Sequence, residues 1–322
     1  MRAGPGSGHS GDIQNVAGAS LIAIDWGTTA ARAYRLDARG AVAGERASAL
    51  GIARVQPGGF PAALSALLGE WRDDAAPKLA CGMIGSRQGW REAPYVACPA
   101  SLDALASRLA QVDGAQMTIV PGLITRDRHG VPDVMRGEET QLLGAVEPGE
   151  AVLAVLPGTH SKWARVERGA VVDFATWMTG ELYAVLLDHS LLGRMAAREA
   201  PFTPDAFDRG VRRGLDDGSL AHDIFGARTL SLMGELRPEE VADWLSGLLV
   251  GRELRGARAW AVRAGIDPSR VRVIGSDALA ERYELAMADA GMLAERGIAD
   301  AAAHGLWRIA LRAGIVAARV SA

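Results

Sequence analysis

The sequence is short of cysteine. Only Cys81 and Cys98 occur among its 322 residues. Two cysteines are too few for a disulfide framework, and their separation does not match the spacing of a cysteine metal site. Cys81 lies inside an apolar, strand-like run, so we expect a buried thiol in preference to a reactive one. The sequence therefore indicates neither a disulfide-stapled nor a cysteine-ligated metal protein.

Long apolar runs and long runs of one charge are also absent. No window of about 18 apolar residues occurs, so we expect no membrane-spanning helix. The net charge is −3, and acidic and basic side chains alternate over most of the sequence. That pattern is typical of solvated helix faces and indicates neither a nucleic-acid nor a membrane-surface partner. We expect a cytoplasmic protein. Its oligomeric state is open, with a homodimer among the options.

Residues 1–18 are rich in Gly, Ser and other polar residues and lack the apolar segment of a signal peptide. We expect them to form a disordered leader. The full length allows two domains at a rough prior of ~100–200 residues each. We place the first over residues 19–147 and the second over residues 148–322. We expect the last helix to pack back on the first domain.

Strand-like and helix-like patterns alternate in the first half. Apolar runs over 21–26 and 78–84 predict strands, and apolar residues at helical spacing over 61–71 predict a helix between them. This alternation predicts an α/β domain with a central sheet. A strand over 151–156 and a hairpin over 162–175 then repeat the strand, glycine turn and hairpin that open the sequence. The repeat predicts two domains of one topology that face each other across a cleft.

The first strand ends in Asp25, and the turn after it contains Gly27, Thr28 and Thr29. A carboxylate at a strand end suits a hydrated Mg²⁺. Glycine lets the backbone approach a ligand, and the threonines offer hydroxyl and amide donors to phosphate oxygens. Read alone, the same residues could form an ordinary strand connection. A P-loop motif and a dinucleotide fingerprint are both absent, so neither of those folds is supported.

Two later glycine turns also follow strands. The residues concerned are Gly158, Thr159, His160 and Lys162 in one turn, and Gly275 and Ser276 in the other. The first could offer donors to the β- and γ-phosphates, with its lysine neutralising the transferring phosphoryl group. The second opens a helix, where a nucleoside could lie against the backbone near the N-terminus. A tight turn with a surface lysine and a routine helix N-cap are the alternatives.

Phosphoryl transfer to a hydroxyl needs a carboxylate that accepts the alcohol proton. Glu138 and Glu139 fall in the first turn of a helix expected over 137–146, where the helix dipole favours a negative charge. Routine acidity at a helix start is the alternative. The choice between the two acids stays open, and we prefer Glu138.

Taken in order, the runs Asp-Trp-Gly-Thr-Thr, Gly-Glu-Glu, Gly-Thr-His and Ile-Gly-Ser resemble the motifs of the sugar kinase, Hsp70 and actin superfamily. This resemblance implies an α/β fold of two ribonuclease-H-like (actin-like ATPase) domains, with ATP and Mg²⁺ in the cleft between them. Within the superfamily, the sequence closely resembles the 2-dehydro-3-deoxygalactonokinase family. The runs Met-Arg-Gly-Glu-Glu-Thr-Gln-Leu at 135–142 and Met-Thr-Gly-Glu-Leu at 178–182 are the most specific matches.

The resemblance implies transfer of the ATP γ-phosphate to the 6-hydroxyl of 2-dehydro-3-deoxy-D-galactonate, in galactonate catabolism. The acceptor carries a carboxylate, so we expect an arginine partner, with Arg32 and Arg136 as first choices. Ser86 and Trp90 could line the sugar pocket, although Trp90 could equally be a core or lid aromatic. Glu181 could bind sugar hydroxyls or cap a helix. The alternative functions are a kinase of another sugar or sugar acid and a non-kinase ATPase or phosphohydrolase.

Overall fold

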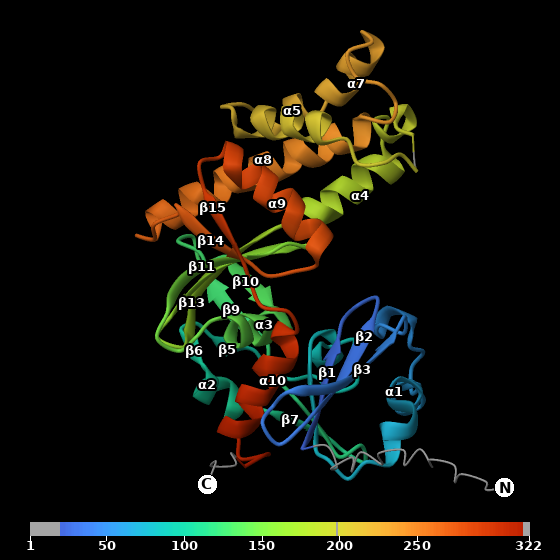
Figure 1. Ribbon diagram of the computed structural model, residues 1–322, viewed down its shortest axis with the longest axis vertical. Coiled ribbons are helices and arrows are strands. Elements are labelled where there is room, and N and C mark those ends of the chain that lie inside the picture. Colours follow the sequence, from blue (N-terminus) through green and yellow to red (C-terminus); the bar gives the residue numbers. More distant parts are fainter. Residues whose placement is uncertain (1–19, 198, 318–322) are drawn as a thin grey trace, which may run out of the picture.

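The computed structural model describes residues 20–197 and 199–317, so the expected leader, residues 1–18, lies outside the described residues. Over the described ranges the chain forms two six-stranded sheets and a three-stranded sheet, with helices around them (Figure 1). No helix in these ranges is long and apolar enough to cross a membrane.

The first sheet has the order β3-β2-β1-β4-β8-β7. Its strands are β1 (Leu21–Trp26), β2 (Ala31–Leu36), β3 (Val42–Ser48), β4 (Lys78–Cys81), β7 (Ala110–Val112) and β8 (Met117–Ile119). The first three form an antiparallel meander, and β4 and β8 continue the sheet parallel to β1. Along β1 the side chains alternate between two cores, Leu21 and Ala23 in one and Ile22 and Ile24 in the other. This is the period of two that an extended strand imposes.

The second large sheet has the order β15-β14-β11-β12-β13-β6. Its strands are β6 (Ala100–Ser101), β11 (Ala151–Leu156), β12 (Ser161–Glu167), β13 (Ala170–Trp177), β14 (Arg270–Val273) and β15 (Leu293–Arg296). Here too a meander, β11-β12-β13, is extended by two strands parallel to its first strand. The same order and directions in both halves confirm the predicted fold class, α/β with two ribonuclease-H-like units.

The remaining elements surround these sheets. The small sheet has the order β10-β9-β5 and contains β5 (Val96–Ala97), β9 (Leu123–Arg126) and β10 (Pro132–Met135). The α-helices are α1 (Phe60–Leu68), α2 (Leu102–Ala106), α3 (Glu138–Ala145), α4 (Thr179–His189), α5 (Pro204–Leu215), α6 (Leu220–Asp223), α7 (Gly226–Leu232), α8 (Val241–Arg263), α9 (Asp277–Asp289) and α10 (Ala301–Arg312). Helices α4, α5, α7 and α8 gather at the end of the molecule away from the first sheet (Figure 1).

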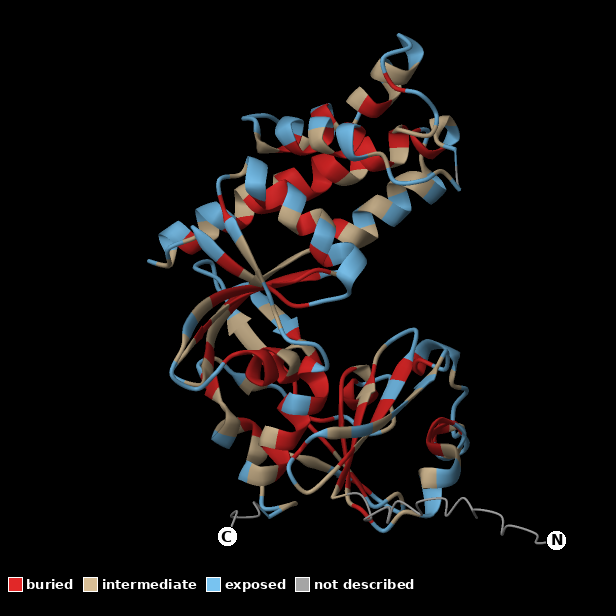
Figure 2. Ribbon diagram, viewed as in Figure 1, coloured by how far each residue is buried: buried red, intermediate tan, exposed pale blue. Residues whose placement is uncertain are grey.

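One hydrophobic core reaches into both halves. It combines the inner faces of β1 and β4 with those of β11 and β12, and it contains α3 and α10. Figure 2 shows these two helices buried between the sheets. Helix α10, from the end of the chain, packs on α3 and on β1. Because both halves share this core, a division of the chain between residues 147 and 148 stays a prediction.

Candidate active site

A cleft of about 760 Å³ lies where the two halves meet. Five segments line it: the β1–β2 turn, the loop after β4, the junction of β10 with α3, the β11–β12 turn and the end of β14. These segments include all three glycine turns and the Gly-Glu-Glu run that the sequence singled out. The fold therefore brings residues more than 200 positions apart in sequence, such as Gly27 and Gly275, to one cavity.

Two glycines with left-handed backbones bring β1 and α3 together. Gly82 follows β4 with φ +92°, and Gly137 precedes α3 with φ +106°. A Cβ on Gly137 would lie 3.1 Å from the Gly82 Cα, and one on Gly82 would lie 3.2 Å from Asp25 Oδ1. Glycine adopts this backbone without the penalty of a side chain. The end of β1 and the start of α3 can therefore meet at one wall of the cleft.

Asp25 is half-buried on this wall. Gln141 Nε2 lies 3.5 Å from its Oδ2, and Cys81 Sγ lies 3.9 Å from its Oδ1. Burial raises the pKa of Asp25 to about 6, and the charge of Glu138 adds to the rise. Gln141 was not predicted from the sequence, although its i,i+3 spacing from Glu138 places both on one face of α3. An acid in such surroundings would be stabilised in its charged form by a nearby cation.

The two acids at the start of α3 have different surroundings. Glu138 lines the cleft, and its Oε2 accepts the N–H of Arg136 at 2.9 Å. Glu139 is fully buried and accepts the N–H of Gly137 at 2.6 Å and the hydroxyl of Thr140 at 2.8 Å. Burial, followed by the charge of Glu138, raises the pKa of Glu139 to about 8. Of the two acids, Glu138 is the one that a ligand in the cleft could touch.

The β1–β2 turn lies open to the cleft, with Gly27, Thr28 and Thr29 along its rim. The carbonyls of Gly27 and Thr28 each accept an N–H at 3.1 Å from the segment after β3, which fixes the turn from behind. Arg32 on β2 lies opposite Asp25 in the strand register and also lines the cleft. The turn thus offers hydroxyl groups, and β2 a cationic group, beside the Asp25 carboxylate.

The β11–β12 turn faces it from the other half and presents Gly158, Thr159 and His160 to the cleft. The N–H of Glu181 donates to the Thr159 carbonyl at 2.9 Å. The Glu181 carboxylate contacts Nε2 of His160. Glu181 therefore holds the turn and its imidazole and does not line the cleft.

Lys162 connects the two halves across the floor of the cleft. Its Nζ donates to the Val134 carbonyl at 3.0 Å and to Thr176 Oγ1 at 2.9 Å. Thr176 in turn donates its hydroxyl to Asp133 at 2.6 Å. Burial raises the pKa of Glu138, and the positive charge of Lys162 opposes that rise. The lysine thus ties β12 to β10 and lowers the cost of a charged Glu138.

Arg136 forms a corner of the cleft with Tyr95. Its Cζ lies 4.4 Å from the centre of the Tyr95 ring, and its Nη2 donates to the Ala93 carbonyl at 2.8 Å. Arg136 is only 8% exposed, yet its Nε and Nη1 have no partner in the described part of the chain. The buried hydroxyl of Ser86 has none there either. Since unpartnered buried donors cost free energy, this corner suits an anionic ligand group. Tyr95 was not among the site residues predicted from the sequence.

Several predicted site residues lie outside the lining of this cleft: Ser86, Trp90, Glu139, Glu181 and Ser276. Trp90 stacks on Phe60 with ring centres 5.8 Å apart and packs against the core beneath α1. Ser276 precedes α9 as its N-cap residue, without a side-chain cap hydrogen bond, while the adjacent Gly275 lines the cleft. The structure thus brings the backbone of the third turn to the cavity but not its hydroxyl.

Two carboxylates line this cleft and could contact a metal ion, those of Asp25 and Glu138. Across the described residues, no group of three or more His, Cys, Asp or Glu side chains is arranged to hold a metal. Mg²⁺ commonly keeps several waters and binds through one or two carboxylates and the phosphates of a substrate. Asp25, exposed to the cleft beside the β1–β2 turn, fits that mode of binding.

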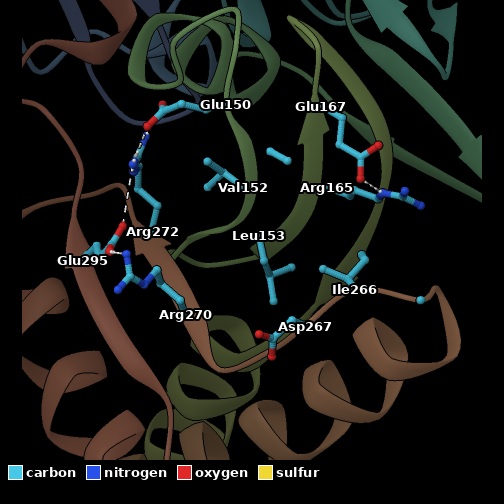
Figure 3. Close-up of a pocket in the computed structure, with 12 residues that line it drawn as sticks. Glu150, Val152, Leu153, Arg165, Glu167, Ile266, Asp267, Arg270, Arg272 and Glu295 are labelled. Carbon is cyan, nitrogen blue, oxygen red and sulfur yellow. Dashed lines mark hydrogen bonds and ion pairs between the residues drawn. The ribbon is translucent and has the colours of Figure 1, made fainter.

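A second hollow, of about 660 Å³, lies in the second sheet, at the ends of β11, β12 and β14 that are far from the cleft. Figure 3 shows most of its charged side chains directed at a partner of opposite charge. Arg272 lies 2.8 Å from Glu150 and 3.6 Å from Glu295, and Arg165 lies 2.6 Å from Glu167. Because these arginines already bind carboxylates, the hollow is a poor site for a phosphate group.

Comparisons with known proteins agree with this geometry. Residues 25–309 match the 2-keto-3-deoxy-galactonokinase family. The 2-dehydro-3-deoxygalactonokinase of Escherichia coli (strain K12) is 36% identical over 270 residues, 83% of this chain and 89% of that protein. A Rhizobium meliloti (strain 1021) protein assigned the same activity is 37% identical over 301 residues, 88% of this chain and 97% of that one.

Solved structures give the same result. A crystal structure of a Sinorhizobium meliloti protein assigned as a 2-dehydro-3-deoxygalactonokinase superposes with a TM-score of 0.82 at 36% identity. It covers 90% of this chain and 98% of that one. An activator of 2-hydroxyisocaproyl-CoA dehydratase from Clostridium difficile, at 14% identity and a TM-score of 0.50, shares the fold alone. The chain belongs to the 2-keto-3-deoxy-galactonokinase family of carbohydrate kinases.

Proposed function

We propose that the protein transfers the γ-phosphoryl group of ATP to the 6-hydroxyl of 2-dehydro-3-deoxy-D-galactonate, in galactonate catabolism. The observation that supports this most is the convergence of three glycine turns, Asp25 and Glu138 on one cleft. Family membership supports the same reaction, because the relative from Escherichia coli carries the name of this activity. We further propose a cytoplasmic location, where ATP is supplied. A homodimer stays a prediction.

In this proposal each half of the protein binds part of the nucleotide. Thr28 and Thr29 on one side and Gly158 and Thr159 on the other would donate to phosphate oxygens, as backbone and hydroxyl groups do in anion sites. Gly275 would lie against the nucleoside, with Ser276 opening the helix beside it. Asp25 would hold Mg²⁺, which when bound would neutralise charge on the phosphates.

Glu138 is our candidate for the base that accepts the acceptor's hydroxyl proton. It is the acid of the pair that lines the cleft, and Lys162 and His160 both favour its charged form. A charged carboxylate can take a proton, whereas an acid whose pKa is about 8 is mostly protonated at neutral pH. We therefore assign Glu139 a supporting role, fixing the start of α3 through Gly137 and Thr140.

Arg136 is our candidate for the partner of the acceptor carboxylate. Its unpartnered Nε and Nη1 supply donors in a corner formed by Tyr95, and the buried Ser86 hydroxyl, which also has no partner in the described residues, is a further candidate donor. Arg32, beside Asp25, is better placed to interact with phosphate. We leave Trp90 and Glu181 out of the acceptor site, because one packs in the core and the other holds His160.

The acceptor assignment can be tested with a matched pair of compounds, the sugar acid and its primary amide. Wild-type protein should favour the acid in kcat/KM by about 10²-fold, since an Arg–carboxylate contact is stronger than a neutral hydrogen bond. Arg136→Gln should lose most of this preference by slowing the acid alone. Arg87→Gln is a suitable control, because Arg87 is 88% exposed and pairs with Glu92 outside the cleft lining. An unchanged acid-to-amide ratio in Arg136→Gln would refute the assignment.

The activity itself is tested by measuring ADP release with a panel of acceptors. The panel contains 2-dehydro-3-deoxy-D-galactonate, its gluconate epimer, plain sugars and polyphosphate. We expect release that depends on the first compound. ADP release that does not depend on any sugar acid or sugar would indicate a non-kinase ATPase. Cleavage of polyphosphate would indicate a phosphohydrolase. Release with a plain sugar alone would identify a kinase of another sugar.

A further inference from the structure

A buried carboxylate lies behind the β11–β12 turn, on the side of β12 that faces away from the cleft. It belongs to Glu253 of α8, which is 1% exposed. Three elements donate hydrogen bonds to it. Trp163 Nε1 of β12 donates to Oε1 at 2.8 Å, Tyr283 Oη of α9 donates to Oε2 at 2.8 Å, and Thr179 Oγ1 at the start of α4 also donates to Oε2.

The hydrogen bonds continue to a fourth residue. Tyr283 has one hydroxyl proton, which it gives to Glu253, so the Ser161 hydroxyl donates to Tyr283 over their 3.0 Å contact. Ser161 and Trp163 flank Lys162 in β12. Successive side chains of a strand point to opposite faces. Trp163 therefore contacts the carboxylate directly and Ser161 contacts it through Tyr283, while Lys162 points into the cleft. Glu253 thus holds the back of the strand segment whose front lines the site.

The third donor links the carboxylate to the turn itself. Helix α4 begins at Thr179, and its next residue, Gly180, packs directly on the turn. A Cβ on Gly180 would lie 2.5 Å from the Gly158 carbonyl oxygen. Glu181 follows, with its N–H on the Thr159 carbonyl at 2.9 Å and its carboxylate on His160. A shift of the first turn of α4 would therefore move Gly158, Thr159 and His160.

A carboxylate is an expensive group to bury, and an apolar side chain of similar size often stabilises a fold as well or better. Burial raises the pKa of Glu253, and its hydrogen-bond donors oppose the rise. Two of its direct donors belong to β12, which follows the β11–β12 turn, and to α4, which packs on that turn. The arrangement therefore fixes the spacing of those segments, which an apolar contact would leave free to slide.

We propose that Glu253 is a positioning residue that holds the β11–β12 turn in the geometry needed to bind the phosphates of ATP. It acts through Thr179, Trp163 and the Tyr283–Ser161 pair and touches no substrate. The inference rests on the proposed function in one respect, that this turn binds ATP phosphates.

Glu253→Gln tests the role with little change in volume. The indole N–H of Trp163 can only donate, so the amide oxygen must face it. The amide nitrogen then faces Thr179 and Tyr283, where it replaces an acceptor with a donor. We expect the link to α4 to weaken and the KM for ATP to rise by roughly tenfold, the equivalent of about one buried hydrogen bond. The KM for the sugar acid should stay within about twofold, because Arg136 and Tyr95 lie in the other half.

Asp223→Asn is the matched control. Asp223 is also a buried carboxylate, bound by Arg213 and by Arg252, the neighbour of Glu253 in α8. Neither it nor its partners line the cleft. This variant should lower the thermal midpoint as Glu253→Gln does and leave both KM values unchanged. Thr179→Val removes the same hydrogen bond from the α4 side and serves if Glu253→Gln does not fold.

Calorimetric titration with a non-hydrolysable ATP analogue separates the two claims. Wild-type protein that binds no nucleotide would refute the proposed function. Wild-type protein that binds it while Glu253→Gln or Thr179→Val binds it equally well would refute the positioning role alone. The role would also be refuted if the KM values for ATP and sugar acid rose by the same factor, or if Asp223→Asn raised the KM for ATP as much.

Discussion

At the scale of single residues, the cleft contains two neighbouring acids that the fold treats differently. Glu138 faces the cavity and Lys162, and Glu139 turns inward to Gly137 and Thr140. Sequence position could not separate them, since both occupy the first turn of α3. Which of the two acids faces the cleft depends on how the start of α3 packs against Gly82, and Gly82 lies in a loop more than fifty residues earlier.

Replacing Glu138 with Gln should lower kcat by ~10²–10⁴ while the Kd for ATP changes little, because the amide keeps the shape but cannot accept the proton. Steady-state kinetics with a separate binding measurement would show this. Glu139→Gln should lower kcat far less, since its side chain does not reach the cleft. If the Glu138→Gln variant keeps wild-type kcat, the base is another group.

The pKa of Glu139 predicts how stability depends on pH. In the folded protein this acid keeps its proton up to about pH 8, while the unfolded chain loses it near the ordinary value of 4.5. The unfolded state therefore binds fewer protons between these values, and the free energy of unfolding falls as pH rises through that window. The loss is complete once the pH exceeds about 8.

Glu139→Gln should remove this contribution. Urea unfolding at several pH values, without nucleotide or metal, should show wild type losing stability relative to the variant between about pH 4.5 and 8. The raised pKa of Asp25 causes a similar fall in the free energy of unfolding between pH 3.8 and about 6. Because Asp25 is present in both proteins, this contribution cancels in the difference between them. Parallel pH curves for the two proteins would contradict the assignment.

At the scale of elements, local pattern was enough to predict the hairpins. The apolar run before Asp25 forms β1, and the run over 151–156 forms β11 with the bounds expected. The turn of the second hairpin occurs at Arg168 and Gly169, both with positive φ. Such segments are predictable because alternation of side chains and turn residues are encoded within a few positions.

Elements that depend on distant partners were not predictable. The pairing of β6 with β13 carries two residues of the first half into the sheet of the second. Nothing in the local sequence of Ala100 and Ser101 indicates that partner. The same holds for Arg136, whose stacking on Tyr95 joins segments 41 residues apart, and for the carboxylate of Glu253. Contacts of this kind follow from tertiary packing and not from local propensity.

The crossing of α3 and α10 gives a test at this scale. A Cβ on Gly305 would lie 1.9 Å from the Thr140 carbonyl oxygen, so alanine would force the helices apart. We expect Gly305→Ala to lower the free energy of unfolding by ~1–3 kcal/mol or more. Alanine elsewhere in a helix normally stabilises relative to glycine, so the sign itself is diagnostic.

Gly149→Ala is the control, because no atom lies within 4 Å of the Cβ that would be added there. Urea unfolding of both variants should show a large loss for Gly305→Ala and a change within about 0.5 kcal/mol for the control. A Gly305→Ala protein as stable as wild type would mean that α10 does not pack on α3 this closely.

At the scale of the whole molecule, the repeated topology was predicted from the order of strands and turns, and the last helix was expected to pack back on the first domain. The sequence predicted two domains, over residues 19–147 and 148–322, but not a hydrophobic core that is common to both. The structure has a core that both sheets share, closed by α3 from the first half and α10 from the end of the chain, beside further cores that lie within one half. The cleft is therefore built over a common hydrophobic floor.

This shared core predicts cooperative unfolding. Scanning calorimetry without ligand should give one heat-absorption peak for both halves, because neither sheet can lose α10 without exposing the core of the other. Addition of the ATP analogue should shift that single peak upward, since a ligand that binds the folded state stabilises it. Two well-separated peaks, with one of them insensitive to nucleotide, would contradict the shared core.

The central claim is that the protein transfers the γ-phosphoryl group of ATP to the 6-hydroxyl of a sugar acid in this cleft. Phosphorus NMR of a single reaction mixture tests this claim most directly. With ATP, Mg²⁺ and 2-dehydro-3-deoxy-D-galactonate, we expect a phosphomonoester on the terminal oxygen to form in equal amount with ADP, and Glu138→Gln to form almost none. ADP that accumulates with inorganic phosphate while the sugar acid stays unchanged would contradict the account.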